Sequence, residues 1–361
     1  MTDHPPAIDG PRLLICGWAG AGNIGDELLT AAIVAMVRGA GGVPVVASRD
    51  PGTTAAEHEV ESVPWGMGAR GAVATVDGVI VGPGGILQDG SSLWNLPGHL
   101  AAALAARRRG VPVAAFGVGA EPLRRRSSAR LLRRALADAP VVTRDEGSSD
   151  ALRAAGLHPT TAADLAFTLD LPDAPAEPND EIIVAVGPGV KPGLVRPAAR
   201  RLVAPPVAQI AAAVERLAVE QGYRVALAGF RGRRDRDVAA ELRAALSVDA
   251  RLVDDTVDAH VGAVAGARLV VASRYHAVVL AARAGVPAHV VSTEPKLRSL
   301  AADLGPDRAT LGSWADLAAP TGQPRPAPLR SGEFAGAGEV AGAIAAFVAD
   351  VGARRGDGVG G

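Results

Sequence analysis

RLLICGWAGAGNIGDELLTAAIVAMVRG, residues 12–39, runs in one stretch through a strand, a glycine-rich turn and a helix. Residues 12–17 are apolar on both faces of an extended chain, which is typical of a strand buried inside a parallel sheet. From Asp26 to Arg38 the apolar side chains recur at the spacing of an amphipathic helix. A strand that leads through such a turn into a helix is the repeating unit of doubly wound α/β folds.

The same unit recurs in both halves of the chain. Strands are predicted in the first half over residues 43–48, 78–82 and 111–117 and from residue 140, and in the second half over residues 181–187, 223–229, 267–273 and 286–291. Between the halves, residues 171–180 hold three prolines and three acids, which is typical of an interdomain linker. We therefore expect two Rossmann-like domains, residues 10–170 and 181–353, and a last helix, residues 339–353, that can cross back to the first domain.

The composition is that of a globular protein that works in the cytoplasm. The 361 residues are 48% apolar, yet no apolar run approaches the roughly 18 to 20 residues of a membrane helix. The start, Met-Thr-Asp-His-Pro-Pro, lacks the basic and apolar segments of a secretory signal. The net charge of −1 argues against nucleic-acid binding by bulk electrostatics. Cys16 is the single cysteine, which excludes a disulfide framework and a cysteine-based zinc site, and we expect no metal.

Glycine-rich turns follow several of the predicted strands, at residues 17–26, 82–89, 117–119 and 187–189. In open α/β sheets ligands bind beyond the carboxyl ends of the strands, where glycine lets backbone N–H groups come close to a ligand. The spacing of Gly20, Gly22 and Gly25 also matches the dinucleotide-binding fingerprint. The two residues that follow, Asp26 and Glu27, would repel a pyrophosphate at that helix end, so dinucleotide binding is disfavoured.

Arg274 and His276 are the pair of residues best suited to chemistry. They stand two apart after the predicted strand 267–273, so they point the same way if the strand geometry continues. Arginine binds a phosphate or carboxylate through two parallel hydrogen bonds, and histidine gives or takes a proton near neutral pH. A salt-bridged arginine beside a structural histidine is the alternative that the spacing leaves open.

Five blocks of the chain combine these glycines with polar residues: GNIGD at 22–26, GGILQD at 84–89, RDEGS at 144–148, ADLAF at 163–167 and ASRYHA at 272–277. In this order they resemble the motifs of the polysaccharide pyruvyl transferase family. A later segment, Glu294-Pro295-Lys296 followed by Leu304-Gly305, is similar to the cell-wall-type members of that family. Each block is moderately specific, and the ordered set is much more so.

The resemblance implies a GT-B-like fold, with two Rossmann-like domains that face a cleft. It also implies transfer of a pyruvyl group from phosphoenolpyruvate, as co-substrate and without a further cofactor, to hydroxyls of a saccharide. The acceptor would be a cell-wall or exopolysaccharide precursor, free or lipid-linked, which is compatible with peripheral association with a membrane. The implied catalytic residues are His276 and Asp26. The residues expected to bind the donor are Arg144, Arg274, Gly22, Asn23, Gly84, Gly85 and Ser273, and those expected at the acceptor or in the cleft are Gln88, Asp89, Lys191 and Lys296.

The chain departs from the family pattern after the strand 181–187. Many members carry Arg-Pro there, whereas this chain has Gly187-Pro-Gly-Val-Lys191-Pro192. A lysine supplies a charge but not the planar fork of an arginine. Two rival functions therefore stay open: a GT-B glycosyltransferase with a nucleotide-sugar donor, and a catalytically silent binding protein on the same scaffold.

Overall fold

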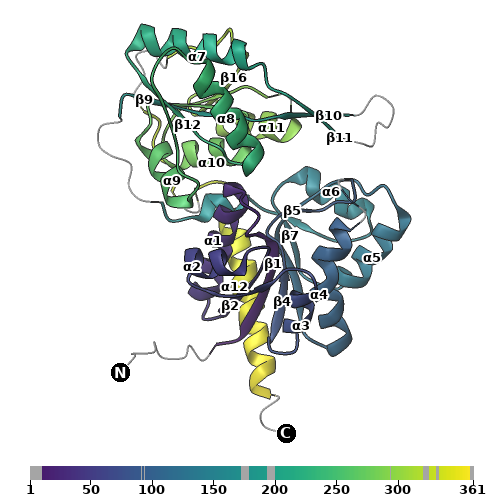
Figure 1. Cartoon of the computed structure of the whole chain (residues 1–361). Coiled ribbons are helices and arrows are strands. Elements are labelled where there is room, and N and C mark those ends of the chain that lie inside the picture. Colours follow the sequence, from purple (N-terminus) through teal and green to yellow (C-terminus); the bar gives the residue numbers. More distant parts are fainter. Residues whose placement is uncertain are drawn as a thin grey trace, which may run out of the picture. The chain divides into compact units, whose positions relative to one another are not determined.

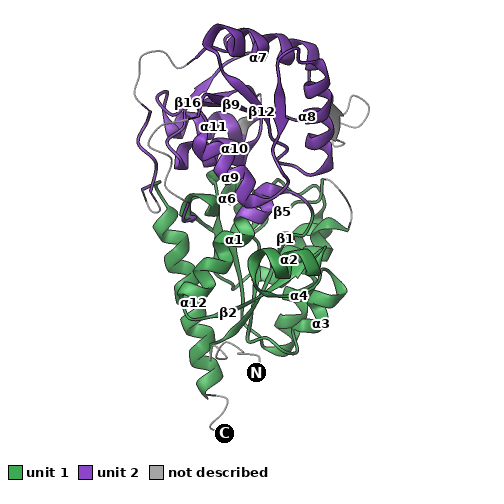
Figure 2. Ribbon diagram, turned by 60° about the vertical axis from the view of Figure 1, so that its left-hand side comes forward, with its two compact units in different colours: residues 1–21, 29–168, 334–361 green, residues 22–28, 169–333 purple. Residues whose placement is uncertain are grey.

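The computed structural model describes residues 10–90, 92, 94–171, 179–192, 200–292, 294–319, 325–330 and 333–357, and only the backbone of residues 190–192, 200–203, 295 and 357. Its contacts divide the chain into two compact units (Figure 2). Unit 1 comprises residues 1–21, 29–168 and 334–361, and unit 2 comprises residues 22–28 and 169–333. The first residues of helix α1 (Ile24–Gly39) therefore count with unit 2, and helix α12 (Ala337–Asp357) counts with unit 1.

Unit 1 is built on a sheet of eight described strands that all pair in parallel. The order across the sheet is β3-β2-β1-β4-β6-β7-β8, and β5 pairs with β6. The strands are β1 (Arg12–Ala19), β2 (Val43–Ser48), β3 (Glu61–Pro64), β4 (Gly78–Val81), β5 (Gly84–Leu87), β6 (Val113–Ala120), β7 (Val141–Thr143) and β8 (Thr160–Thr161). Besides α1 and α12, the described helices are α2 (Pro51–His58), α3 (Met67–Ala72), α4 (Asn95–Arg109), α5 (Arg126–Leu136), α6 (Glu146–Ala154) and the 3-10 turn η1 (Leu165–Thr168).

The two faces of this sheet are covered by different helices because neighbouring residues of a strand point to opposite sides. Leu14 of β1 joins the core that holds Leu100 of α4. On the other face Phe116 of β6 meets Phe347 of α12 edge-on, with 5.7 Å between ring centroids. Helix α12, yellow in Figure 1, thus covers the unit 1 sheet although it ends the chain.

Unit 2 holds a second parallel sheet, of six described strands in the order β13-β12-β9-β14-β15-β16. Its core packs strand residues such as Ile182 and Val271 against Leu217 of α7. The strands are β9 (Glu181–Ala185), β12 (Arg224–Leu227), β13 (Ala250–Leu252), β14 (Leu269–Ala272), β15 (Ala288–Val290) and β16 (Ala309–Leu311), with an antiparallel pair β10 (Gly189–Pro192) and β11 (Arg200–Val203). The helices are α7 (Val207–Gln221), α8 (Arg233–Ala245), α9 (Val257–Gly266), α10 (Tyr275–Arg283) and α11 (Pro295–Leu304).

Two separate parallel sheets confirm the predicted α/β fold class. The strands that the sequence did not predict are short, and β3, β13 and β16 among them lie at or next to sheet edges. Residues 172–178 of the predicted linker lie outside the described residues. Over the part of the chain that is described, no helix is both long and apolar enough to cross a bilayer.

Candidate functional site

Asn23 organises the turn between β1 and α1. Its side-chain oxygen accepts a hydrogen bond from the Gly25 amide at 3.1 Å, and its Nδ2 donates to Asp26 Oδ2 at 2.5 Å. Its carbonyl accepts the amides of Asp26 and Glu27 at 2.9 and 3.0 Å. Just before it, Gly22 has a left-handed backbone with φ of 67°. Asn23 therefore caps α1 and orients the Asp26 carboxylate at the helix N-terminus, where the helix dipole favours a negative charge.

His276 lies against this turn. It belongs to the first turn of α10, and a Cβ added to Gly25 would stand 2.8 Å from its Cε1 and closer still to Nδ1. Only glycine therefore allows the backbone of the turn to approach the imidazole this closely. Tyr275 packs edge-on to the same ring, with 5.4 Å between ring centroids. The start of α1 and the start of α10 thus meet within unit 2.

Strand geometry does not continue from β14 to His276. The strand ends at Ala272, Arg274 caps α10 with an extended backbone, and the helix begins at Tyr275. The expected common direction of Arg274 and His276 rested on a continued strand, so it does not follow. The cause is the strand-to-helix turn, which intervenes between the two residues.

Arg274 is buried and paired with Asp235 of α8. Its Nε and Nη2 each donate to one carboxylate oxygen at 2.7 Å, and Nη2 also donates to the Pro188 carbonyl at 3.2 Å. The Asp235 carboxylate, fully buried, also accepts the Arg231 amide at 3.0 Å. Gly187 leaves the room for this pair, because a Cβ there would collide with both side chains. Nε and Nη2 are thus engaged within the chain.

A short β-bridge between Asn23 and Arg231 joins the α1 turn to the start of α8. Backbone and side-chain bonds therefore connect Asn23 to Arg274 through Arg231 and Asp235. Ser273 stands beside Arg274, and its Oγ is inaccessible to solvent and has no hydrogen-bond partner among the described residues. Buried hydroxyls are nearly always hydrogen-bonded, so this one is suited to a ligand.

Arg144 follows β7 in unit 1. Its Nε lies 3.4 Å from Asp145 Oδ2, and its Nη1 lies 3.6 Å from Oδ2 of the buried Asp164. The guanidinium also packs against Gly119, and a Cβ on Gly85 would stand 3.5 Å from Nη2. Two carboxylates and two glycines thus hold Arg144 at the carboxyl edge of the sheet, where α/β proteins bind their ligands.

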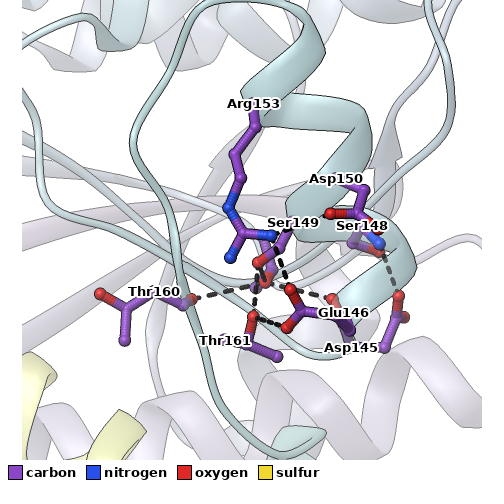
Figure 3. Close-up of polar contacts among 9 residues, drawn as sticks. Asp145, Glu146, Ser148, Ser149, Asp150, Arg153, Thr160 and Thr161 are labelled. Atoms are coloured by element: carbon purple, nitrogen blue, oxygen red, sulfur yellow. Dashed lines mark hydrogen bonds and ion pairs between the residues drawn. The ribbon is translucent and has the colours of Figure 1, made fainter.

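The rest of the RDEGS block builds the start of α6 (Figure 3). Asp145 caps the helix by accepting the Ser148 amide at 2.7 Å, and Ser148 Oγ accepts the Ala120 amide at the end of β6 at 3.0 Å. Ser149 Oγ lies 2.6 Å from the Thr143 hydroxyl and 2.7 Å from that of Thr161. The block and Ser149, which follows it, therefore fasten the ends of β6, β7 and β8 next to Arg144.

Asp89 is a buried anchor for the start of α5. Its carboxylate accepts the amides of Arg124 and Arg125 at 2.9 and 3.1 Å. Burial opposes the charge of Asp89, but these hydrogen bonds, a further one from the Ser128 side chain and the charge of Arg125 together outweigh it and lower the pKa of the carboxyl. Gln88 beside it accepts the Gly90 amide at 2.8 Å. Gln88 thus orders the turn after β5, and Asp89 orders the residues just before α5.

The remaining predicted site residues are spread over both units. Gly84 opens β5 with a left-handed φ of 106°. Lys296 is exposed in the first turn of α11, and its Nζ lies 3.2 Å from Glu294 Oε2. Lys191 pairs with Arg201 across β10 and β11, and its side chain lies outside the described residues.

The predicted site residues are thus divided between the two units. Unit 2 holds Gly22, Asn23, Asp26, Lys191, Ser273, Arg274, His276 and Lys296, and unit 1 holds Gly84, Gly85, Gln88, Asp89 and Arg144. Sequence reasoning missed Asp235 as the partner of Arg274. Asp235 stands in the run Arg-Gly-Arg-Arg-Asp-Arg-Asp, residues 231–237, where no pattern distinguishes the carboxylate that turns inward from its neighbour.

Comparison with known proteins identifies both a family and a fold. The model of the polysaccharide pyruvyl transferase family matches residues 23–295, a range that includes Asn23, Arg144, Asp235 and His276. No curated protein sequence matches the chain.

Solved structures of other proteins share the fold. UDP-GlcNAc 2-epimerase from Methanocaldococcus jannaschii superposes with a TM-score of 0.55 at 10% identity, over 90% of this chain and 97% of that one. HepE from Anabaena, in complex with UDP and glucose, superposes with a TM-score of 0.51 at 13% identity, over 97% of this chain and 99% of that one. UDP-GlcNAc 2-epimerase from Neisseria meningitidis, bound to UDP-GlcNAc, superposes with a TM-score of 0.52 at 11% identity, over 84% of this chain and 87% of that one. The chain therefore has a GT-B-like fold, as predicted.

Proposed function

Because the chain belongs to the polysaccharide pyruvyl transferase family, we propose that it transfers the pyruvyl group of phosphoenolpyruvate to two hydroxyls of a saccharide. Carbon C3 of the donor takes up a proton, two sugar oxygens bond to C2, and the bond from C2 to the phosphate oxygen breaks. Of the two hydroxyl protons lost, one balances the proton at C3 and the other leaves with phosphate. The products are a cyclic pyruvate ketal and inorganic phosphate. The family match over residues 23–295 carries the proposal.

His276 and Asp26 are the proposed proton-transfer groups. The contact of the imidazole with Gly25 puts it at the start of α1, where Asn23 holds the Asp26 carboxylate. Histidine can protonate C3 of the enol, which makes C2 electrophilic. Asp26 can orient the attacking hydroxyl or accept its proton. In the alternative assignment, His276 is the base that accepts the proton of the sugar hydroxyl, and the same two residues carry the chemistry.

The donor carries a phosphate and a carboxylate, so the proposed donor ligands are cations, hydroxyls and amides. Arg144 supplies a fixed guanidinium in unit 1. In unit 2 the Ser273 hydroxyl is the buried group suited to a ligand, and a donor contact by Arg274 would come from Nη1, since Nε and Nη2 bind Asp235. The amides of the turns at Gly22, Asn23, Gly84 and Gly85 complete the proposed set.

The acceptor is proposed to be a cell-wall or exopolysaccharide precursor, free or lipid-linked. Gln88, Asp89, Lys191 and Lys296 remain its proposed neighbours. Asp89 would act through the chain it orders, because its carboxylate is committed to two backbone amides. Phosphoenolpyruvate is a metabolite of the cytoplasm, so the proposal places the reaction there.

A thermal-shift comparison of two donors tests this proposal against a nucleotide-sugar transferase of the same fold. A ligand at about 100 times its Kd stabilises the folded state by roughly 2.7 kcal/mol. We expect phosphoenolpyruvate to raise the melting temperature and UDP-GlcNAc to leave it unchanged. Ser273→Ala should weaken the phosphoenolpyruvate effect without lowering the melting temperature of the unliganded protein. A melting temperature that rises with UDP-GlcNAc but not with phosphoenolpyruvate would support the hypothesis of a glycosyltransferase with a nucleotide-sugar donor.

A further inference from the structure

Trp18, Arg49 and Trp65 stand together at the carboxyl edge of the unit 1 sheet. Trp18 is next to last in β1, Arg49 follows β2, and Trp65 follows β3. These strands are neighbours, and their register sets Ala19 beside Ser48 and Ser48 beside Pro64. The three side chains therefore leave the sheet side by side, at the edge where α/β proteins bind ligands.

The rings form one packed cluster with His99 of α4. The centroids of Trp18 and Trp65 are 5.9 Å apart, and His99 lies 5.1 Å from the first and 5.4 Å from the second. His99 is 1% exposed, and neither ring nitrogen has a hydrogen-bond partner among the described residues. The cluster is therefore held by ring packing, which keeps both indoles in fixed positions.

Arg49 covers this cluster with an exposed charge. Its guanidinium carbon lies 4.5 Å from the Trp18 ring centroid and 5.1 Å from that of Trp65. Over the described part of the chain, no carboxylate forms an ion pair with Arg49. A guanidinium stacked on indoles keeps the N–H groups of its edge, which can hold a phosphate or carboxylate through two hydrogen bonds.

Trp94 lies just before α4, the helix that carries His99 of the cluster. It is 78% exposed and precedes α4, one helical turn before Gly98. A Cβ on Gly98 would stand 2.6 Å from Cζ2 of Trp65, so the Trp65 ring covers that face of the helix. Residues four apart lie on one helix face about 6 Å apart, and the Trp94 carbonyl accepts the Gly98 amide at 3.0 Å, so the backbone of Trp94 lies one helical turn from the position that Trp65 covers. Of the chain's four tryptophans, two therefore belong to the ring cluster and a third stands one helical turn from it.

We propose that Trp94 and Arg49, supported by Trp18, Trp65 and His99, form a subsite for a saccharide that carries a negative charge. The exposed indole offers a flat apolar surface to the C–H face of a sugar ring, and Arg49 binds the phosphate or carboxylate of the same saccharide. The inference rests on the proposed function, in which a saccharide is the acceptor, and it names that acceptor as anionic.

Titrations followed by saturation-transfer NMR test this subsite without any turnover. The probes are glucose 1-phosphate, glucuronate and glucose, which separate a phosphate from a carboxylate and both from a neutral sugar. We expect the two anionic sugars to bind more tightly than glucose. Trp94→Ala should weaken all binding about tenfold, and Arg49→Gln should weaken only the anionic sugars, also about tenfold, as for one lost charge-assisted contact.

Two exposed residues supply matched controls. Val219→Ala removes an exposed apolar side chain in unit 2, and Arg108→Gln removes an exposed charge on α4, and neither should change binding. Equal affinity for glucose and the anionic sugars, or unchanged binding in Trp94→Ala, would overturn the subsite. Binding of anionic sugars at Trp94 by a protein that does not bind phosphoenolpyruvate would instead overturn the proposed function and leave the subsite standing.

Discussion

Gly25 is the residue whose size decides where His276 can stand. A methyl group there would overlap the imidazole, which must then move away from Asn23 and Asp26. Displacement of a catalytic group by about 1 Å can cost on the order of a hundredfold in rate. Gly25→Ala should therefore lower turnover of phosphoenolpyruvate by that order and leave the melting temperature nearly unchanged.

Gly39, at the other end of α1, is the matched control. A Cβ there meets nothing within 4 Å, so Gly39→Ala should keep full activity and gain slightly in helix stability. Phosphate release measured for both variants gives the comparison. Equal rates in Gly25→Ala and Gly39→Ala would show that the position of His276 does not matter to the reaction.

His276 itself is expected to act through its proton. His276→Ala and His276→Gln should both bind phosphoenolpyruvate, because the proposed donor ligands remain, while turnover falls by on the order of 10² to 10⁴. Phosphate release against donor concentration separates the two effects, and circular dichroism checks the fold. Near-normal turnover in His276→Gln would mean that the ring only donates a hydrogen bond, and Asp26 would be the next residue to test.

Single residues also mark the limit of what could be predicted. Arg274 and His276 were found because their motif is local in sequence. The partner of Arg274 was not, since Asp235 comes from another helix and only the fold turns its carboxylate inward. Pairing of buried charges is a tertiary property, and neither periodicity nor spacing encodes it.

Among the elements, α5 depends on a single buried carboxylate. Asp89 accepts two amides at its start, so Asp89→Asn should cost about 1.5 to 3 kcal/mol of unfolding free energy at pH 7. The folded-state pKa of Asp89 is lowered, so this stabilisation is complete above the unfolded pKa and is lost as pH falls through the folded one. Urea unfolding should therefore show the gap between wild type and Asp89→Asn closing as the pH falls below the unfolded pKa of about 3.9.

Asp138 provides the control at the end of the same region. Asp138 is exposed, and its Oδ2 lies 3.9 Å from Arg107 Nη2. Asp138→Asn should therefore change the free energy of unfolding by less than about 0.5 kcal/mol. If Asp89→Asn proves as mild as Asp138→Asn, the two amide bonds do not anchor α5.

Elements were predictable where both faces of a strand are buried. The predicted ranges for β2 and β4 agree with the structure to within a residue, because such strands read as continuous apolar runs. Strand β3, by contrast, is Glu-Ser-Val-Pro at a sheet edge, and its partly exposed residues carry no such signal.

At the scale of the whole molecule, acid should destabilise the fold through His99. Burial in the aromatic cluster, with the nearby charge of Arg49, lowers the pKa of His99 from 6.5 to about 4. Between these values the unfolded chain binds the proton more readily, so stability falls as pH falls from 6.5 towards 4. This lowering of the His99 pKa corresponds to a loss on the order of 3 kcal/mol in the free energy of unfolding.

His99→Phe, which keeps an aromatic ring, should remove most of this pH dependence, while the exposed His158→Gln should retain it. Burial also lowers the pKa of His260, so a smaller slope in the same direction should remain. Unfolding free energies at pH 7 and pH 5 provide the measurement, and an unchanged slope in His99→Phe would contradict the assignment.

The central claim, pyruvyl transfer, is tested most directly by mass spectrometry of saccharides incubated with the enzyme and phosphoenolpyruvate. Lipid-linked and polymeric saccharides extracted from the organism that encodes the chain supply the acceptors. The account predicts a saccharide that gains one pyruvate as a ketal, one phosphate released per ketal formed, and formation of both products slowed by on the order of 10² to 10⁴ with His276→Ala. UDP-GlcNAc consumed in place of phosphoenolpyruvate, with a sugar added to the acceptor and no ketal, would contradict it.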